Sequence, residues 1–367
     1  MASIIVRSKL ISSMVKNRRA NSEDIDAELN LKSTSIAELL AEDRDVDFKD
    51  IQSIAKYFKK PWSYLLLEHE ETMPTIGRDH RTVRNVEASF SSDMLNESVW
   101  AEDYLDEAKE LSEEGSSLSP TLPVEHTPAG VRDFFDISTD DIFKLRDDYA
   151  ALKLWVRKIE STGVYVAQRR IPDETIRAYS TSKHGIVLIV VNTRDSAAAR
   201  IFSLMHEYCH VLFNTTGLCD FDEHNTVETK CNRFAADVLM PAGDLAEKND
   251  SYEFNLDLIK DEEHAIWLSR KFKVSQAAMF IRLLEKHYIS EPTYRALERR
   301  RALRKAKKSS GGDYYKAKIN AVGVKYASLV LDALSRGVIN RKDSSVLLGV
   351  GEYSVVSFKE NLRKNVE

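Results

Sequence analysis

The segment Ala198–Phe213, AARIFSLMHEYCHVLF, constrains the fold more than any other part of the chain. Its apolar residues recur at helical spacing, which predicts one helix that starts near Ser196. Residues four apart lie on one face of a helix, so His206 and His210 can direct their imidazoles at one metal ion. Glu207 lies at the edge of that face, where its carboxylate can reach a water molecule without being a ligand. The alternative is a helix that carries these polar residues on its surface.

A catalytic zinc site also needs a third protein ligand and an open position for water. The segment TVETKCNRFAADVLMP predicts a helix over about 227–239, which ends before Pro241. Glu228 falls in the first turn of that helix and can project toward the first helix. A carboxylate in a first turn can also be favoured by the helix dipole alone. The candidates for the third ligand are Cys219, Asp220, Asp222, His224, Glu228 and Cys231.

The segments ARIFSLMHEYCHVLF and VETKCNRFAADVLMP together resemble the ImmA/IrrE family of zinc metallopeptidases. In that family, H-E-x-x-H is followed by E-x-x-A-N-x-F-A-x-x-L-x-P. Cys209 and Cys231 stand where the family usually has small residues, and we expect both to be small buried side chains. Glu228, Asn232, Phe234 and Ala235 match the second pattern at its spacing, and the matching Leu239 and Pro241 follow one residue further along the chain.

The resemblance implies a site in which Zn²⁺ is held by His206, His210 and Glu228, and in which Glu207 is the general base. Zincins usually add a second donor to the developing oxyanion. The sequence leaves three candidates for that donor open, namely Tyr179, His184 and His224.

Three strand-like runs precede the motif helix, GVYVAQR, TIRAYST and GIVLIVVN, and turn signals separate them. A helix with a capping-box-like start is expected from near Thr139. This order predicts an α+β fold with a zincin-like peptidase core over residues 131–245, made of a small sheet and the active-site helices.

All-α regions are predicted on both sides of this core. Residues 1–70 resemble a Cro/repressor-like helix-turn-helix domain, in which STSIAELLAEDRD would be the recognition helix. That helix is acidic where DNA contact favours Arg, Lys, Asn or Gln. The unit is therefore either a DNA-binding domain or a helical docking domain that does not bind DNA.

The remaining boundaries follow from breaks in the pattern. Residues 71–130 are interpreted as a connecting segment and linker, 246–308 as a helical extension, and 309–367 as a C-terminal helical domain. The basic run RALERRRALRKAKK at 295–308 is either a solvated helix face or a patch for nucleic acid or an acidic partner.

Composition limits the class of protein. The net charge of −5 gives the whole chain no electrostatic signature of a nucleic-acid binder. The longest apolar run, GIVLIVV, is far shorter than the roughly 18 residues that span a bilayer. Three cysteines do not make a disulfide framework, and the N-terminus lacks the pattern of a secretory signal. We therefore expect a cytoplasmic protein.

These features predict a zinc-dependent endopeptidase. The resemblance implies a protein substrate such as a helix-turn-helix transcriptional repressor, whose cleavage derepresses mobile-element or stress-response genes. DNA bound through residues 1–70 is a second partner, against which the acidic helix argues, and no membrane partner is expected. The alternative is a non-proteolytic transcriptional regulator or antitoxin-like binding protein that uses the zincin fold as a scaffold or sensor. An intact Glu207 argues against this alternative, and the oligomeric state is left open.

Overall fold

The structure is a computed structural model of the 367-residue chain. The chain divides into two compact units, one of Met1–Thr75 and Ser89–Glu102 and the other of Ile76–Ala88 and Asp103–Glu367. The division into five domains stays a prediction. The residues that the structure describes are 3–18, 22–29, 31–58, 65, 92–113, 117–171, 173, 176–213, 221–250, 252–254, 258–303 and 313–366.

The first unit combines helices with a two-stranded antiparallel sheet, so the prediction of an all-α N-terminal region is wrong. Within the predicted helix-turn-helix, α2 and α3 correspond to the two short helices that the sequence predicts. Their assignment as a DNA-binding helix-turn-helix stays a prediction. The elements of the unit are β1 (Ser3–Val6), α1 (Ser8–Arg18), α2 (Ser22–Leu29), α3 (Ile36–Ala41), β2 (Arg44–Asp47), α4 (Phe48–Tyr57) and the start of α5 (Ser92–Leu111).

The sheet forms because the chain leaves the helical conformation after Ala41. Glu42 has an extended φ of −155°, whereas we expected the helix to continue through Asp45. The alternation of acidic and other residues after this point suits a strand with one face buried. Val46 is fully buried and lies opposite Ile4 of β1.

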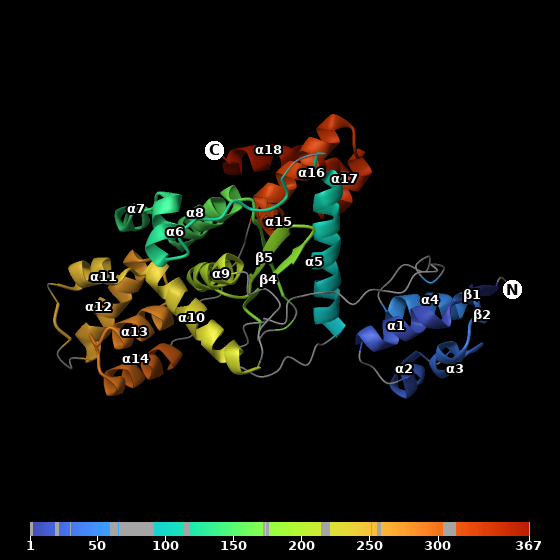
Figure 1. Cartoon of the computed structure of the whole chain (residues 1–367), viewed down its shortest axis with the longest axis horizontal. Helices are drawn as coiled ribbons and strands as arrows, with labels where there is room; N and C mark the ends of the chain where they lie inside the picture. Colours follow the sequence, from blue (N-terminus) through green and yellow to red (C-terminus); the bar gives the residue numbers. More distant parts are fainter. Residues whose placement is uncertain are drawn as a thin grey trace. The chain divides into compact units, whose positions relative to one another are not determined.

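The second unit is built on a three-stranded sheet of order β3-β5-β4, which confirms the three predicted strands (Figure 1). The strands are β3 (Tyr165–Arg169), β4 (Ala178–Lys183) and β5 (Ile186–Asn192). The central strand β5 runs parallel to β3 and antiparallel to β4. Only Val187 among its residues is not buried, which explains why the sequence of β5 is a continuous apolar run.

Helices cover this sheet from several sides. The helix expected from near Thr139 is divided in two, with Ser138 capping one helix and Asp147 the other. α8 contacts β3, and α9 lies on β4 and β5. α5 also begins within the segment that we interpreted as connecting and linker sequence. The helices before and after the strands are α6 (Pro128–Phe135), α7 (Thr139–Lys144), α8 (Asp148–Ser161), α9 (Ala197–Leu212) and α10 (Phe221–Leu239).

The described elements after α10 are all helices, as the sequence predicts. In α14, Arg295, Arg300 and Arg301 each form an ion pair with a glutamate. For residues 295–303, this pairing favours the interpretation of the basic run as a solvated helix face. The last five residues of the run, 304–308, lie outside the described residues. The elements are α11 (Ala242–Asn249), α12 (Leu258–Lys271), α13 (Gln276–Glu285), α14 (Glu291–Leu303), α15 (Tyr314–Val322), α16 (Val324–Arg336), α17 (Arg341–Leu347), η2 (Glu352–Ser354) and α18 (Val355–Val366).

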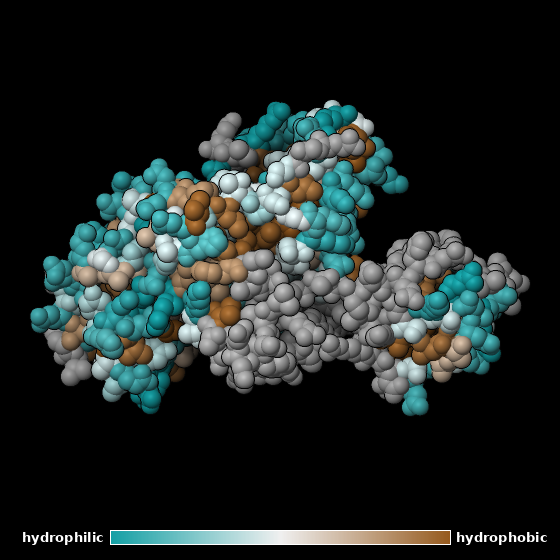
Figure 2. Space-filling model, in the orientation of Figure 1, coloured by the Kyte–Doolittle hydropathy of each residue, from teal (hydrophilic) through white to brown (hydrophobic). Residues whose placement is uncertain are grey.

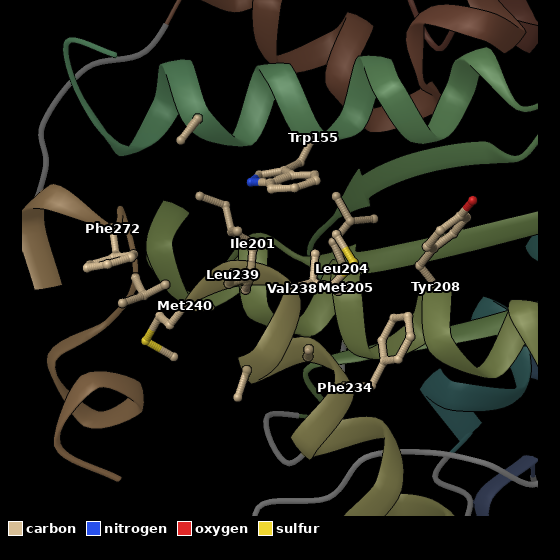
Figure 3. Packing of buried hydrophobic residues seen from close by; sticks show 14 of the residues in the cluster. Trp155, Ile201, Leu204, Met205, Tyr208, Phe234, Val238, Leu239, Met240 and Phe272 are labelled. Atoms are coloured by element: carbon tan, nitrogen blue, oxygen red, sulfur yellow. The ribbon is translucent and has the colours of Figure 1, made fainter. Parts of the chain in front are cut away.

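The main hydrophobic core lies between α8, α9 and α10 (Figure 3). Trp155 of α8 is 2% exposed and lies over Ile201 and Leu204 of α9. Every residue of α9 except Ala199 and Phe202 is buried. The alternative of a surface helix with exposed polar residues is therefore wrong. Among the described residues, no helix has the length and apolar character that crossing a membrane requires.

Candidate metal centre

The helix α9 carries the two histidines and the glutamate of the H-E-x-x-H motif into the protein interior. It begins at Ala197, one residue after the predicted start, and Ser196 caps it by accepting a hydrogen bond from the backbone of Ala199. His206 is 0% exposed, and Glu207 and His210 are each 1% exposed. Burial of such groups costs free energy unless polar partners or a metal ion satisfy them. The contacts around these three side chains therefore decide what the site can do.

The helix α10 faces α9 and supplies the third candidate ligand. It begins at Phe221, whereas we expected a start near 227. The residues before 227 are mainly polar and lack apolar periodicity, so the sequence carried no helical signal there. Glu228 consequently lies in the third turn of α10, and its assignment to the first turn was wrong. The helix dipole acts on the first turn only, so it does not account for Glu228.

Three ligand atoms converge between the two helices. The Nε2 atoms of His206 and His210 lie 3.1 Å apart. Glu228 spans the pair, with Oε2 at 3.2 Å from His206 Nε2 and Oε1 at 3.2 Å from His210 Nε2. Ligands bound about 2.0–2.1 Å from a zinc ion at tetrahedral angles lie roughly 3.3 Å apart. The spacing of these donors therefore suits one such ion, and all three ligand atoms lie within 4.8 Å of one another.

A neighbouring amide orients the first of these imidazoles. His206 Nδ1 lies 3.1 Å from Asn232 Oδ1, one turn beyond Glu228 on α10. Because an amide oxygen only accepts hydrogen bonds, Nδ1 donates to it, and Nε2 is the atom that would bind a metal in place of the proton it donates to Glu228. In the sequence Asn232 was a matching position without a role, and this contact gives it one.

Glu207 is held by a residue that sequence reasoning missed. Ser180 of β4 is 3% exposed, and its hydroxyl donates a hydrogen bond of 2.9 Å to Glu207 Oε2. The bond restrains a carboxylate that is one residue away from His206 along α9. A serine within a predicted strand carries no sequence signal of such a contact, because the pairing of α9 with β4 is tertiary.

The electrostatics of the cluster favour positive charge between the helices. Burial acts against charge on both His210 and Glu228, yet their mutual contacts outweigh it. Hydrogen bonds with Cys231 and Glu228, together with the charge of Glu207, raise the pKa of His210 to about 11. Hydrogen bonds from the two histidines hold the pKa of Glu228 well below its usual range. Protons and a divalent cation compete for such a site.

Among the described side chains, no other candidate ligand joins this group. Cys231 is buried and contacts Cys209 and His210 but is not among the three converging donors, in keeping with its expected packing role. Cys219 and Asp220 lie outside the described residues. Asp222 and His224 fall within α10, in a part where the side chains are not described.

The second oxyanion donor stays open among the predicted candidates. Tyr179 is 0% exposed within β4. His184 lies in the turn between β4 and β5, where its Nε2 is 2.8 Å from Asp106 Oδ1. His224, the third candidate, has no described side chain.

A known protein family matches the part of the chain that contains the candidate metal centre. Residues 159–284 match the family described as peptidase M78, IrrE N-terminal-like domain. The match begins at the end of α8, contains the sheet, α9 and α10, and ends within α13. It supports the resemblance to the ImmA/IrrE family and a peptidase-type domain in this part of the chain. No curated protein matches the chain.

Proposed function

We propose that the protein is a zinc-dependent endopeptidase that cleaves a specific partner protein. One observation carries the proposal. The ligand atoms of His206, His210 and Glu228 lie at mutual spacings suited to one metal ion, with the carboxylate of Glu207 beside them. The match of residues 159–284 to a peptidase family supports the same conclusion.

Two imidazole nitrogens and one carboxylate are the donor set of many catalytic zinc sites. Zinc bound there would polarise a peptide carbonyl and lower the pKa of water toward neutrality. The chain's own residues orient these donors, because Asn232 fixes the tautomer of His206 and the packing of α9 on α10 holds His210 beside Glu228. Glu228 is 16% exposed, so the cluster is most accessible from its side.

Glu207 is the proposed general base. It would take a proton from the attacking water and pass it to the leaving nitrogen. Such transfer needs a carboxylate at a defined position, and the hydrogen bond from Ser180 restrains Glu207 Oε2. A purely structural helix has no need for a buried glutamate next to a histidine pair, which argues for chemistry over a scaffold.

By resemblance, the substrate is a helix-turn-helix transcriptional repressor, and its cleavage would derepress mobile-element or stress-response genes. The N-terminal unit would then recruit the enzyme to that repressor. We place the protein in the cytoplasm on the same grounds, because its proposed substrate acts there.

The test uses the full chain and the repressor encoded next to its gene. Wild-type protein loaded with zinc should cut this repressor at one site, identified by mass spectrometry of the fragments. The Glu207→Gln variant should retain zinc and cut at least about 100-fold more slowly. If the zinc-loaded wild type and the variant leave the repressor equally intact, the scaffold or sensor alternative replaces the peptidase.

A further inference from the structure

The C-terminal helices contain an arrangement that the proposed peptidase does not use. α17 ends at Leu347, a turn of four residues follows, and a helical segment then runs from Glu352 through η2 into α18. α16 packs against both α17 and α18. Two helices joined by a turn of three or four residues and backed by a third helix are the elements of a helix-turn-helix.

The turn is built for a sharp change of direction. Gly349 has a φ of +62°, in the left-handed region that favours glycine. Asn340 begins α17 with a capping box, since its side chain accepts from the backbone of Asp343 and the Asp343 side chain accepts from the backbone of Asn340. Both ends of α17 are therefore defined by local sequence.

One face of the second helix is buried and the other is free. Val355, Phe358 and Leu362 are 2%, 0% and 5% exposed, and their spacing puts them on the face that packs on the other helices. The opposite face carries Val356, which is 49% exposed, and Tyr353 at its start, which is 95% exposed. Further exposed side chains of this outward face are Lys359, Glu360, Arg363 and Lys364.

The charge of this region differs from that of the chain. Residues 313–366 hold nine Lys or Arg against five Asp or Glu, whereas the chain carries a net charge of −5. Residues 1–58, which include the N-terminal helices, hold nine Lys or Arg against ten Asp or Glu. Figure 2 shows the end of the second unit formed by α16, α17 and α18 as mainly hydrophilic, with some hydrophobic residues between.

We propose that α17 and α18 form a DNA-binding helix-turn-helix, with α18 as the recognition helix in the major groove of double-stranded DNA. Val356 lies in the first turn of α18 and Tyr353 in η2 directly before it, near where recognition helices contact base edges, and both offer apolar contact to thymine methyl groups. The cations that would contact phosphates are Arg341 and Lys342 on α17 and Lys359, Arg363 and Lys364 on α18. Two exposed acids, Glu352 and Glu360, lie on the same segment, and a carboxylate there can accept a hydrogen bond from cytosine.

The test measures binding of the full-length protein to a fluorescent random-sequence duplex of about 30 base pairs, roughly three helical turns. Two triple variants are compared, and each removes three exposed positive charges. One replaces Lys359, Arg363 and Lys364 with Ala, and the other replaces Lys9, Lys49 and Lys56 of the N-terminal unit. The two variants have equal net charge, so only the location of the lost charge differs.

The α18 variant should bind DNA at least about ten-fold more weakly, and the slope of log K against log salt should fall by up to about 3. The N-terminal variant should bind as the wild type does. The proposal is overturned if the wild type does not bind the duplex, if the N-terminal variant loses as much affinity, or if the α18 variant loses none. Loss of self-association or of binding to a protein, with DNA affinity intact, would make α18 a protein-docking helix instead.

Two further measurements separate this proposal from the peptidase. Selection from the random duplex pool should enrich one sequence with the wild type and a broader set with Tyr353→Ala. The Glu207→Gln variant should bind DNA as the wild type does, whether or not the protein cleaves a repressor. Far-ultraviolet circular dichroism of the variants establishes that they are folded.

Discussion

Two regions of the second unit each hold a glutamate, and the surroundings of these two side chains are opposite in kind. Between α9 and α10, Glu228 lies against two histidines. At the junction of α8 and α16, Glu160 is 8% exposed and accepts a hydrogen bond of 3.1 Å from the backbone of Lys325, at the start of α16. The first glutamate faces side chains that can bind a cation, whereas the second caps a helix of the C-terminal region.

The pKa shifts of the two groups express this difference. Burial raises the pKa of Glu160 to about 7, against backbone hydrogen bonds that favour its charge. The pKa of Glu228 moves the other way despite burial, because two histidines donate to it. Partners, and not depth, therefore separate a candidate metal ligand from a structural carboxyl group.

The junction also requires a close approach of backbones. A Cβ at Gly323, the residue before α16, would lie 2.4 Å from the carbonyl oxygen of Val166, and its φ is +88°. The N-terminus of α16 can therefore reach Glu160 only with glycine at this position. This contact joins the C-terminal helices to β3 of the peptidase-type domain.

The comparison predicts that the same substitution has different effects in the two regions. Glu228→Gln should weaken zinc binding by well over about 100-fold, more than the loss of an outer-shell partner costs, because it removes the anionic member of the proposed ligand set. Glu160→Gln should leave zinc affinity unchanged. Competition with a chromophoric chelator measures both, and an equal loss of zinc in the two variants would break the comparison.

The pH dependence of stability should report Glu160. Its folded pKa of about 7 lies above the value of 4.5 for an unperturbed glutamate, so the folded state keeps a proton that the unfolded state loses. Stability contributed by this group is thus fully present below about pH 4.5 and lost as pH rises to about 7, on the order of 3 kcal/mol. Thermal unfolding at pH 5 and pH 8 measures the difference.

The control for this prediction is Glu160→Gln, which keeps an oxygen acceptor for Lys325 without a titrating proton. The difference between its melting temperatures at pH 5 and pH 8 should be smaller than in the wild type. An unchanged difference would mean that other groups cause the pH dependence.

Loss of the residue that orients a metal ligand should lower zinc affinity less than loss of a ligand itself. Asn232→Ala removes the acceptor of His206 Nδ1, so zinc affinity should fall about 10–100-fold. Asn232→Asp keeps an oxygen acceptor and should retain most of the affinity. Equal affinities for wild type and Asn232→Ala would show that packing alone orients His206.

The smallest expected effect concerns Ser180. Ser180→Ala removes one hydrogen bond to a charged group, which contributes about 1.5 kcal/mol. The rate of repressor cleavage should therefore fall roughly ten-fold. Zinc content should not change, since Ser180 contacts the proposed base and no ligand. Ser180→Thr should restore part of the rate, and a loss of zinc in Ser180→Ala would place Ser180 in the metal site instead.

The features that could be predicted from the sequence depend on neighbouring residues or on a periodic pattern. Helical spacing defined α9, a continuous apolar run defined β5, and the H-E-x-x-H motif with Glu228 indicated three residues that the structure brings together. Each of these signals depends on residues close in the chain. For the same reason the sequence placed Ser196 at the start of the motif helix, next to its true first residue.

Features that arise from tertiary contacts were not predictable. The β1–β2 pairing joins segments about 40 residues apart, the bond of Ser180 to Glu207 crosses from sheet to helix, and the first turns of α10 are mainly polar. Strand pairing and burial between distant segments determine these features, and a single sequence carries no direct signal of either. The role of Glu160 at the start of α16 belongs to the same class.

The metal content of the purified protein tests the central claim most directly. Elemental analysis of wild type, His210→Ala and Glu207→Gln, each prepared with equimolar zinc and freed of unbound metal, gives the stoichiometry per chain. The arrangement of His206, His210 and Glu228 predicts one zinc ion in wild type and in Glu207→Gln, and none in His210→Ala. Wild-type protein without zinc, or His210→Ala with as much zinc as wild type, would contradict the assignment of this cluster as a metal centre.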